Sequence, residues 1–318
     1  MSVPPERPAD DSWINRLSSS LTPKFFKNLF VALGIGLVGG LIAYGINMPL
    51  AWMMGPMLAT FVASLLRVRM GIPMRFRSVI LGVIGVFLGA SFTPDTLDQA
   101  ARWPISMIAV LLYVPIITLV VTWFYSKVAK LDPATALFSA TPGGLTPMVV
   151  LGAAAGGNEQ EIALTQGLRV LLLVMSAPLI VLMITGVVAS GHGDSEAIQM
   201  TLSEGLITAF CAIATVLVFR KIGIPAAEMT GAMMASMVLH VTGLVEGNLP
   251  GWLLAGSLLI LGSAIGRRFA GVKLSFLARL AGYSIFATAL ILAFTGGVAW
   301  FVSDWLDLDY IAVLLAFA

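Results

Sequence analysis

Charged side chains are scarce in this chain. Only 11% of its 318 residues are Asp, Glu, Lys or Arg, whereas 58% are hydrophobic. Soluble domains carry about 25% charged residues. A chain with this composition and a mean hydropathy of +0.97 has too little polar surface to face water. The composition therefore predicts an all-α polytopic membrane protein.

Residues that bind metals or form disulfides are also few. The chain has one cysteine, Cys211, and two histidines, His192 and His240. One cysteine excludes a disulfide framework and a cysteine-based metal site. Oxygen-activating enzymes need several His or carboxylate ligands around copper or iron. We therefore predict no enzyme activity, no cofactor and no metal. No basic segment interleaved with aromatics occurs, so no nucleic-acid partner is expected.

The N-terminal residues 1–28 are predicted to form a disordered cytoplasmic tail, because 1–23 are polar and contain no apolar core of a signal peptide. Apolar segments follow, and most approach the ~20 residues that span a bilayer. They run over 29–46, 49–66, 78–93, 104–126, 134–155, 162–189, 201–219, 225–243, 251–266, 277–302 and 309–318.

The two halves of the chain share a repeated motif. The pattern Pro-x-Ala-x-Met-x-Gly-x-Met occurs at 49–57 and again at 225–233. With one residue inserted, Gly85 and Gly89 align with Gly262 and Gly266. A constant offset over this many positions predicts an internal duplication. We place the first transmembrane repeat at 29–190 and the second at 200–318.

The charged loops of the two copies have opposite bias. Basic residues follow the second helix of one copy and the third helix of the other: Arg67, Arg69, Arg75 and Arg77, against Arg267, Arg268, Lys273 and Arg279. Lys and Arg loops stay cytoplasmic. The copies are therefore predicted to lie upside down relative to each other, as inverted repeats with a cytoplasmic N-terminus.

Lys130 is predicted on the cytoplasmic side of the membrane and the loop 191–196 on the outer side. The chain must therefore cross the membrane an odd number of times between them. One of the segments 134–155 and 162–189 then does not cross, and the first is the better candidate for a re-entrant hairpin. Because Asp132 aligns with Asp309, the sequence ends at Ala318 just before a second Pro-Gly-Gly would fall. We therefore expect the second repeat to be truncated.

The first of these segments is interrupted by helix-breaking residues. Two prolines, Pro142 and Pro147, flank a Gly pair inside an uncharged run. Such a break at membrane depth is tolerated only inside protein or beside water. It is either a kink between packed helices or a transporter site built on a broken helix. The substrate-binding residues predicted here are Thr141, Pro142, Gly143, Gly144 and Thr146.

Two further residues complete the predicted site. Arg169 lies in the following apolar segment, with Gln166 on the same helical face. A charge in the bilayer centre costs about 2.5–3.5 kcal/mol, so Arg169 should face protein or water, unless it snorkels to the headgroups. We expect Arg169 and the open amides around Gly143 and Gly144 to bind an anion. Glu228, which replaces Trp52 of the first copy, is predicted to couple transport to a proton or cation.

Thr141-Pro142-Gly143-Gly144-Leu145, the later Gly156-Gly157-Asn158 and the Gln166-to-Val170 segment resemble the membrane AbrB family, as does the duplicated block at 49–57. Members carry labels such as ammonia monooxygenase or regulator of gene expression. The resemblance implies a relative of transporters with broken helices in the bacterial inner membrane. The chain departs from the family at Pro147, where an acidic residue is common.

The leading hypothesis is a secondary transporter that moves a small organic anion or ion by alternating access. A second is a membrane protein that regulates gene expression indirectly. An ammonia monooxygenase is the least expected. Membrane lipids and a small substrate are the predicted partners, and a homodimer is an option.

Overall fold

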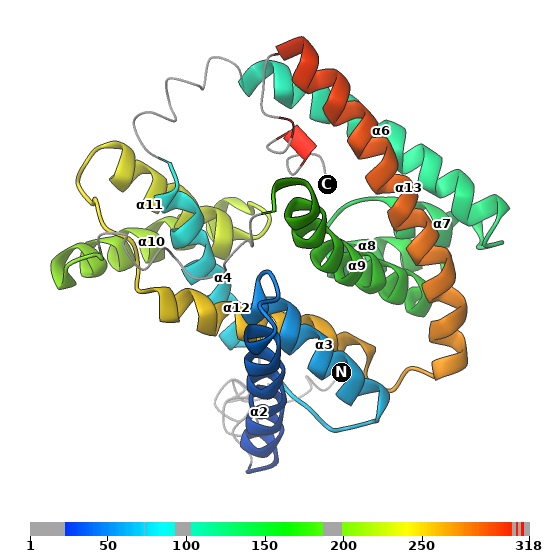
Figure 1. The fold of residues 1–318 in the computed structure, drawn as a ribbon, viewed down its shortest axis with the longest axis horizontal. Coiled ribbons are helices and arrows are strands. Elements are labelled where there is room, and N and C mark those ends of the chain that lie inside the picture. Colours follow the sequence, from blue (N-terminus) through cyan, green and yellow to red (C-terminus); the bar gives the residue numbers. More distant parts are fainter. Residues whose placement is uncertain are drawn as a thin grey trace, which may run out of the picture.

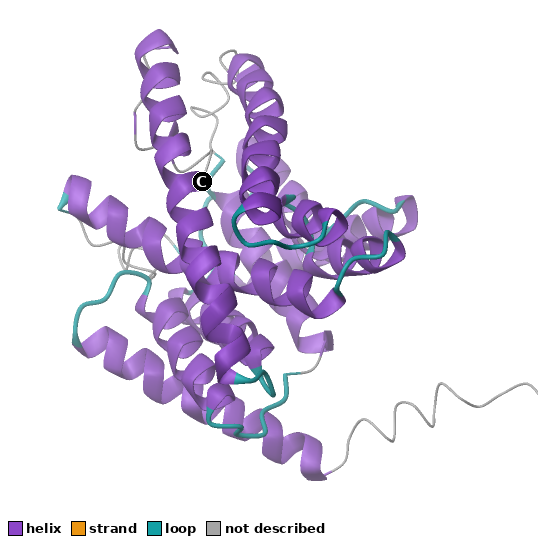
Figure 2. Cartoon of the chain, turned by 90° about the vertical axis from the view of Figure 1, so that its right-hand side faces the viewer, coloured by secondary structure: helices purple, strands orange, loops and turns teal. Residues whose placement is uncertain are grey.

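A computed structural model describes residues 23–72, 74–92, 103–186, 199–306, 310 and 313–314 of the chain. This part is helical and contains no β-strand, apart from an isolated bridge between Gln199 and Asn248. The helices are α2 (Pro23–Gly45), α3 (Ala51–Leu65), α4 (Met74–Ala90), α6 (Trp103–Lys127), α7 (Pro133–Ala140), α8 (Leu145–Ala154), α9 (Glu159–Thr185), α10 (Leu202–Ile222), α11 (Ala227–Val241), α12 (Gly251–Gly266), the short 3₁₀ helix η2 (Arg267–Phe269) and α13 (Leu274–Leu306). Short loops join most of them (Figure 2).

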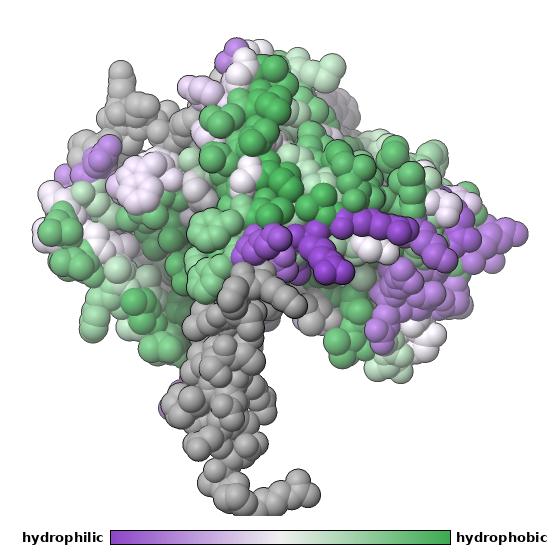
Figure 3. All heavy atoms as spheres, turned by 90° about the horizontal axis from the view of Figure 1, so that it is seen from below, coloured by the Kyte–Doolittle hydropathy of each residue, from purple (hydrophilic) through white to green (hydrophobic). Residues whose placement is uncertain are grey.

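The described helices are long and apolar enough for a membrane protein. Six of them, within α2, α6, α9, α10, α12–η2 and α13, could cross a bilayer by length and composition. Their outward faces carry large apolar side chains, such as Phe210 at 75% exposure. Hydrophobic residues cover much of the face in Figure 3, and hydrophilic ones gather in a band. Such a surface suits lipid, so the prediction of an all-α polytopic membrane protein is confirmed.

Helix α2 starts earlier than the sequence pattern suggested. It begins at Pro23, so the last residues of the predicted 1–28 tail belong to the helix. Proline is favoured at the first helical position because its fixed φ suits the helix and its missing N–H is not needed there. Residues 1–22 lie outside the described residues, as do 307–309, where the second repeat would continue.

The helices divide into two groups (Figure 1). One contains α2, α3, α4, α10, α11 and α12, and the other contains α6, α7, α8, α9 and α13. A cluster that includes Met57, Leu168, Phe269 and Leu280 joins the groups. The rings of Phe61 and Phe269 meet edge to face within it, with centroids 5.0 Å apart.

In the first group, two sets of three helices make the same contacts. Helix α3 packs between α2 and α12, and α11 packs between α10 and α4. The backbone of Gly85 in α4 lies so close to Met229 of α11 that a Cβ would overlap the Met229 carbonyl oxygen. Gly262 in α12 lies in the same way against the carbonyl oxygen of Met53 in α3. Aligned residues therefore occupy matching places in the two sets.

The turns before α3 and α11 are also alike. Leu50 and Ala226, which directly precede these helices, both adopt left-handed backbone angles, with φ of 47° and 52°. Non-glycine residues rarely adopt positive φ. Both helices then run for 15 residues. The same unusual turn at aligned positions ties the repeated motif to a repeated local structure.

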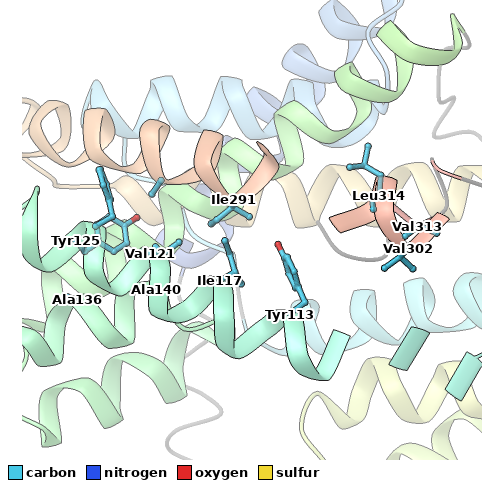
Figure 4. Packing of buried hydrophobic residues seen from close by; sticks show 13 residues of the cluster. Tyr113, Ile117, Val121, Tyr125, Ala136, Ala140, Ile291, Val302, Val313 and Leu314 are labelled. Atoms are coloured by element: carbon cyan, nitrogen blue, oxygen red, sulfur yellow. The ribbon is translucent and has the colours of Figure 1, made fainter. Parts of the chain in front are cut away.

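In the second group, a buried cluster joins α6 to α7 and α13. Tyr113, Ile117 and Val121 of α6 point toward Ile291 of α13 in Figure 4. Ala136 and Ala140 of α7 belong to the same buried cluster. Small side chains on α7 allow the short helix to approach α6 closely, which places the end of α7 inside the bundle.

Candidate functional site

The interrupted segment folds into a helical hairpin. Helix α7 has 8 residues and α8 has 10, so they are about 12 and 15 Å long at 1.5 Å per residue. The amide of Asn158, after α8, donates to Thr135 Oγ1 at the start of α7 over 2.7 Å. Gly152 of α8 lies against Phe138 of α7. The hairpin therefore enters and leaves at the same end, and neither arm alone reaches across a ~30 Å hydrocarbon core. The predicted broken segment is present.

Local chemistry starts the first arm of the hairpin. Asp132 caps α7 by accepting a hydrogen bond from the Thr135 amide at 2.8 Å, and Pro133 follows at the first helical position. Partial burial acts to raise the pKa of the Asp132 carboxyl, but the hydrogen bonds from Thr135 outweigh it and hold this pKa below its ordinary value. The cap is therefore charged at neutral pH.

Gln166 and Arg169 close the other end of α7. Gln166 Nε2 donates to the carbonyl oxygens of Phe138 at 2.8 Å and Thr141 at 2.9 Å. Arg169 Nη1 donates to the Ala140 carbonyl oxygen at 2.7 Å, and Nη2 donates to Gln166 Oε1 at 3.2 Å. These side chains satisfy carbonyl groups that the broken helix leaves without backbone partners. The predicted residues Thr141, Gln166 and Arg169 thus meet.

Arg169 lies deeper than the sequence suggested. Helix α9 begins at Glu159, so Arg169 is almost three turns into it, about 15 Å along the axis. The apolar segment predicted from the sequence begins only at residue 162. The Arg169 guanidinium meets the negative end of the α7 dipole, which favours a cation. Among the described residues it forms no ion pair with a carboxylate. The positive charge is therefore held by the backbone carbonyl of Ala140 and the amide oxygen of Gln166.

A cavity of about 130 Å³ lies beside this network. Pro142 and Arg169 line it together with Tyr113, Ile117 and Ile291. The Tyr113 and Thr295 hydroxyls, on α6 and α13, lie 2.5 Å apart. No sequence pattern indicates these α6 and α13 residues, because only the packing of distant helices brings them to the break.

Buried hydroxyls without partners occur on the same helices. Among the described residues, Ser139 of α7, Thr165 of α9 and Thr288 of α13 have no hydrogen-bond partner and are at most 4% exposed. A buried polar group without a partner costs about 1–3 kcal/mol. Such groups are typical of sites where water or an ion is held. The region near the break therefore has unused hydrogen-bonding capacity.

The second arm presents its own N-terminus at the break. Helix α8 begins after Gly144, which supplies no side-chain cap. Within the described residues, no hydrogen bond satisfies the amides of Gly143 and Gly144. Open amides and the positive end of a helix dipole favour an anion. The side chain of the predicted residue Thr146 lies outside the described residues.

Glu228 lies elsewhere. It is in α11, in the first group of helices, and its Oε1 is 2.6 Å from Arg220 Nη2 of α10. Ser78 of α4 donates to the same oxygen at 3.4 Å. Glu228 lines a different cavity from Arg169, so the structure does not bring the two predicted residues together.

His240 has a packing role in the described structure. Its Nδ1 lies 2.8 Å from the Ser236 carbonyl oxygen and its Nε2 lies 3.1 Å from that of Gly247. Ser236 Oγ in turn donates to the Val86 carbonyl oxygen at 2.8 Å, which ties α11 to α4. Among all the residues that the structure describes, no group of three or more His, Cys, Asp or Glu side chains could hold a metal ion.

Together these features define a polytopic helical membrane protein with a broken hairpin in one helical group. Residues 52–318 match the family described as "Transition state regulatory protein AbrB", and the chain belongs to this family. It is similar to "Putative regulator AbrB" of Escherichia coli (strain K12), with 26% identity over 85% of this chain and 78% of that protein. It is also similar to "Uncharacterized protein YhjN" of Bacillus subtilis (strain 168), with 24% identity over 90% and 80%. No solved structure matches the chain.

Proposed function

We propose that the chain is a secondary transporter for a small anion, which binds at the broken hairpin. The observation that carries the proposal is the guanidinium of Arg169. It lies about 15 Å along α9 without a carboxylate partner in the described residues, and it lines a cavity with Pro142. The open amides at the start of α8 would add a second positive group. An anion offsets the charge that lipid disfavours.

The reciprocal packing of the two three-helix sets supports alternating access. Inverted repeats give a transporter two related states in which the same site opens to opposite sides. The exchange of contacts between Gly85 with Met229 and Gly262 with Met53 fits a two-fold relation between the sets. With the opposite loop charges, we infer that the axis lies in the membrane plane. The N-terminus is then cytoplasmic, in a bacterial inner membrane, as both relatives come from bacteria.

The test is a thermal-unfolding screen of the purified protein in detergent. Chloride, phosphate, acetate and succinate are added singly, since a ligand at 100 times its Kd stabilises the folded state by about 2.7 kcal/mol. We expect at least one anion to raise the unfolding midpoint. Arg169→Gln should abolish that rise, whereas Arg220→Gln, which removes an arginine from another cavity, should keep it. A stabilising anion is then followed into proteoliposomes.

The network around α7 also allows a purely structural role for Arg169. In that case Arg169→Gln lowers the unfolding midpoint without ligand, because a carbonyl of α7 loses its donor. Arg169→Lys separates anion binding from the structural role, because Lys keeps the positive charge but lacks the planar set of N–H donors of the guanidinium. Anion-dependent stabilisation that is unchanged in Arg169→Gln contradicts the proposal, as does a screen in which no anion acts.

The regulatory hypothesis is favoured by the relatives, because the family description and the Escherichia coli protein both carry a regulatory name. An effect on gene expression would then run through transport or through a protein partner. Expression changes should disappear with Arg169→Gln if transport causes them. Their persistence at normal protein levels would favour a protein partner, either a second copy of this chain or another membrane protein.

A further inference from the structure

A second, larger cavity lies in the first group of helices. It measures about 470 Å³, within the usual range for ligand sites, and lies between α4, α10 and α11. One face of α10 lines it over its whole length, from Gly205 to Arg220, about 22 Å. Residues from Ser78 to Val86 of α4 line about 12 Å of the opposite wall. These lengths bracket the ~15 Å depth of one leaflet of the hydrocarbon core.

The cavity is apolar along most of its length and polar at one end. Its middle is lined by aliphatic side chains: Val79, Val83, Val86, Ala209, Ala212, Ile213. At the end of α10, Arg220 pairs with Glu228 over 2.6 Å, and the neighbouring Lys221 is exposed. The Arg220 side chain keeps 50% of its surface exposed despite the ion pair. It therefore has free donors for an anion.

A buried hydroxyl shows that the cavity is more than an apolar gap. Thr208 lines it near its other end and is 2% exposed. Its Oγ1 has no hydrogen-bond partner among the described residues. A hydroxyl in this position is left unsatisfied by aliphatic neighbours. The Thr208 hydroxyl is therefore buried within the wall, and the accessible charged group of the cavity is Arg220 at its other end.

The corresponding place in the other three-helix set is closed. There Gly36 of α2 lies directly against Ser263 of α12. The aligned pair in the second set is Ala212 and Val86, whose side chains pack together in a small cluster. These bulkier residues hold α10 away from α4, and the two helices make few contacts. The cavity therefore exists in one half of the molecule as a result of particular substitutions.

We propose that this cavity binds an acidic lipid, with one acyl chain along α10 and the anionic head at Arg220. Aliphatic walls match the chain, and the basic end formed by Arg220 and Lys221 matches the charge. A free fatty acid and an anionic phospholipid share this chemistry. The inference needs only a membrane location, so it holds or fails independently of anion transport at Arg169.

The experiment measures the unfolding midpoint of the delipidated full chain in detergent with added oleate, dioleoyl phosphatidylglycerol or dioleoyl phosphatidylcholine. Oleate or phosphatidylglycerol should raise the midpoint, and phosphatidylcholine should not. Stabilisation by oleate alone identifies a free acid as the ligand, and stabilisation by phosphatidylglycerol alone identifies a phospholipid. Equal stabilisation by all three lipids would overturn the proposal, because the charged end would then have no role.

Two matched variants test the cavity itself. Ala209→Trp places a large ring in it and should abolish the rise in midpoint. Phe210→Trp, one residue along on the outward face of α10, should leave the rise unchanged. Arg220→Gln should weaken the apparent affinity for the acidic lipid about tenfold. If Ala209→Trp does not fold, a photoreactive fatty acid on the wild type must label the α10 peptide. Labelling confined to other helices contradicts the site.

Discussion

The two three-helix sets share one architecture but differ in how closely their helices pack. In the first, Gly39 of α2 and Gly55 of α3 bring their backbones into contact. In the second, Thr215 takes the place of Gly39, and Gly231 of α11 lies against the backbone of Val216. Small residues allow close helix approach in membranes, where dispersion contacts drive packing. Both sets therefore pack closely around α3 and α11, and they differ at the contact of α2 with α12, because the second set leaves space at the equivalent place between α10 and α4.

The sets also differ at the C-terminal ends of α2 and α10, the first helix of each set. Tyr44 and Trp52 lie near each other in one, with ring centroids 6.2 Å apart. The aligned positions in the other are Arg220 and Glu228, which form an ion pair. An aromatic pair suits the membrane interface, and a charged pair creates a place for polar groups. The two sets thus carry an aromatic pair and an ion pair at aligned positions of a similar helix arrangement.

The largest effect should come from the glycines that the two sets have in common. Gly85→Val and Gly262→Val each place a side chain against the carbonyl oxygen of a neighbouring helix. Overpacking of this kind costs about 1–3 kcal/mol, and we expect the upper end for both. The unfolding midpoints in detergent measure this, with Gly256→Ala as a control because its Cβ would meet nothing within 4 Å. Strong destabilisation in one variant and none in the other would argue against equivalent packing.

A smaller effect should separate the sets. Gly39→Thr introduces the residue of the second set into the first, where even a Cβ would lie 2.5 Å from the Gly55 carbonyl oxygen. We expect a loss of about 2 kcal/mol in the free energy of unfolding. The reverse change, Thr215→Gly, should cost no more than about 1 kcal/mol, which reflects helix propensity. Equal losses in the same midpoint assay would mean that the packing difference does not influence stability.

The smallest effect should come from the cap of α7. Asp132→Asn removes a charged cap and should cost up to about 1 kcal/mol at pH 7. Because the Asp132 pKa is lowered on folding, its stabilisation is present above the ordinary Asp pKa of about 3.9 and is lost as pH falls through the folded value. Hydrogen exchange of the α7 amides measures it. The wild type and Asp132→Asn should converge at low pH, and a constant difference would contradict the assigned cause.

Much of this organisation was predictable because it depends on local chemistry. Pro142, Gly143 and Gly144 cannot continue a helix, so the break follows from the residues alone. The repeated motif predicted matching elements, since the same turn and helix recur after Leu50 and Ala226. Arg169 could be identified because a charged side chain in an apolar membrane segment is unfavourable unless it faces protein or water.

The remaining features depend on the packing of distant segments. Tyr113 and Ile291 look like ordinary residues of apolar helices, and only the contact of α6 with α13 places them at the cavity. Arg169 was expected to hold an anion, but its bond to the Ala140 carbonyl also caps α7. Glu228 was interpreted without a partner, although Arg220, with which it forms an ion pair, is only eight residues away in the sequence. The cavity beside α10 required a comparison of side-chain sizes across the two sets.

The most direct test of the account is the orientation of the two sets. In a Cys211→Ala background, Ile46→Cys and Ile222→Cys place thiols at aligned positions, both 68% exposed, at the C-terminal ends of α2 and α10. A membrane-impermeant maleimide is applied to intact cells and to inverted vesicles. We predict that Ile46→Cys reacts only from the outside and Ile222→Cys only from the cytoplasmic side. Labelling of both from the same side would contradict the inverted arrangement and with it the proposed transport mechanism.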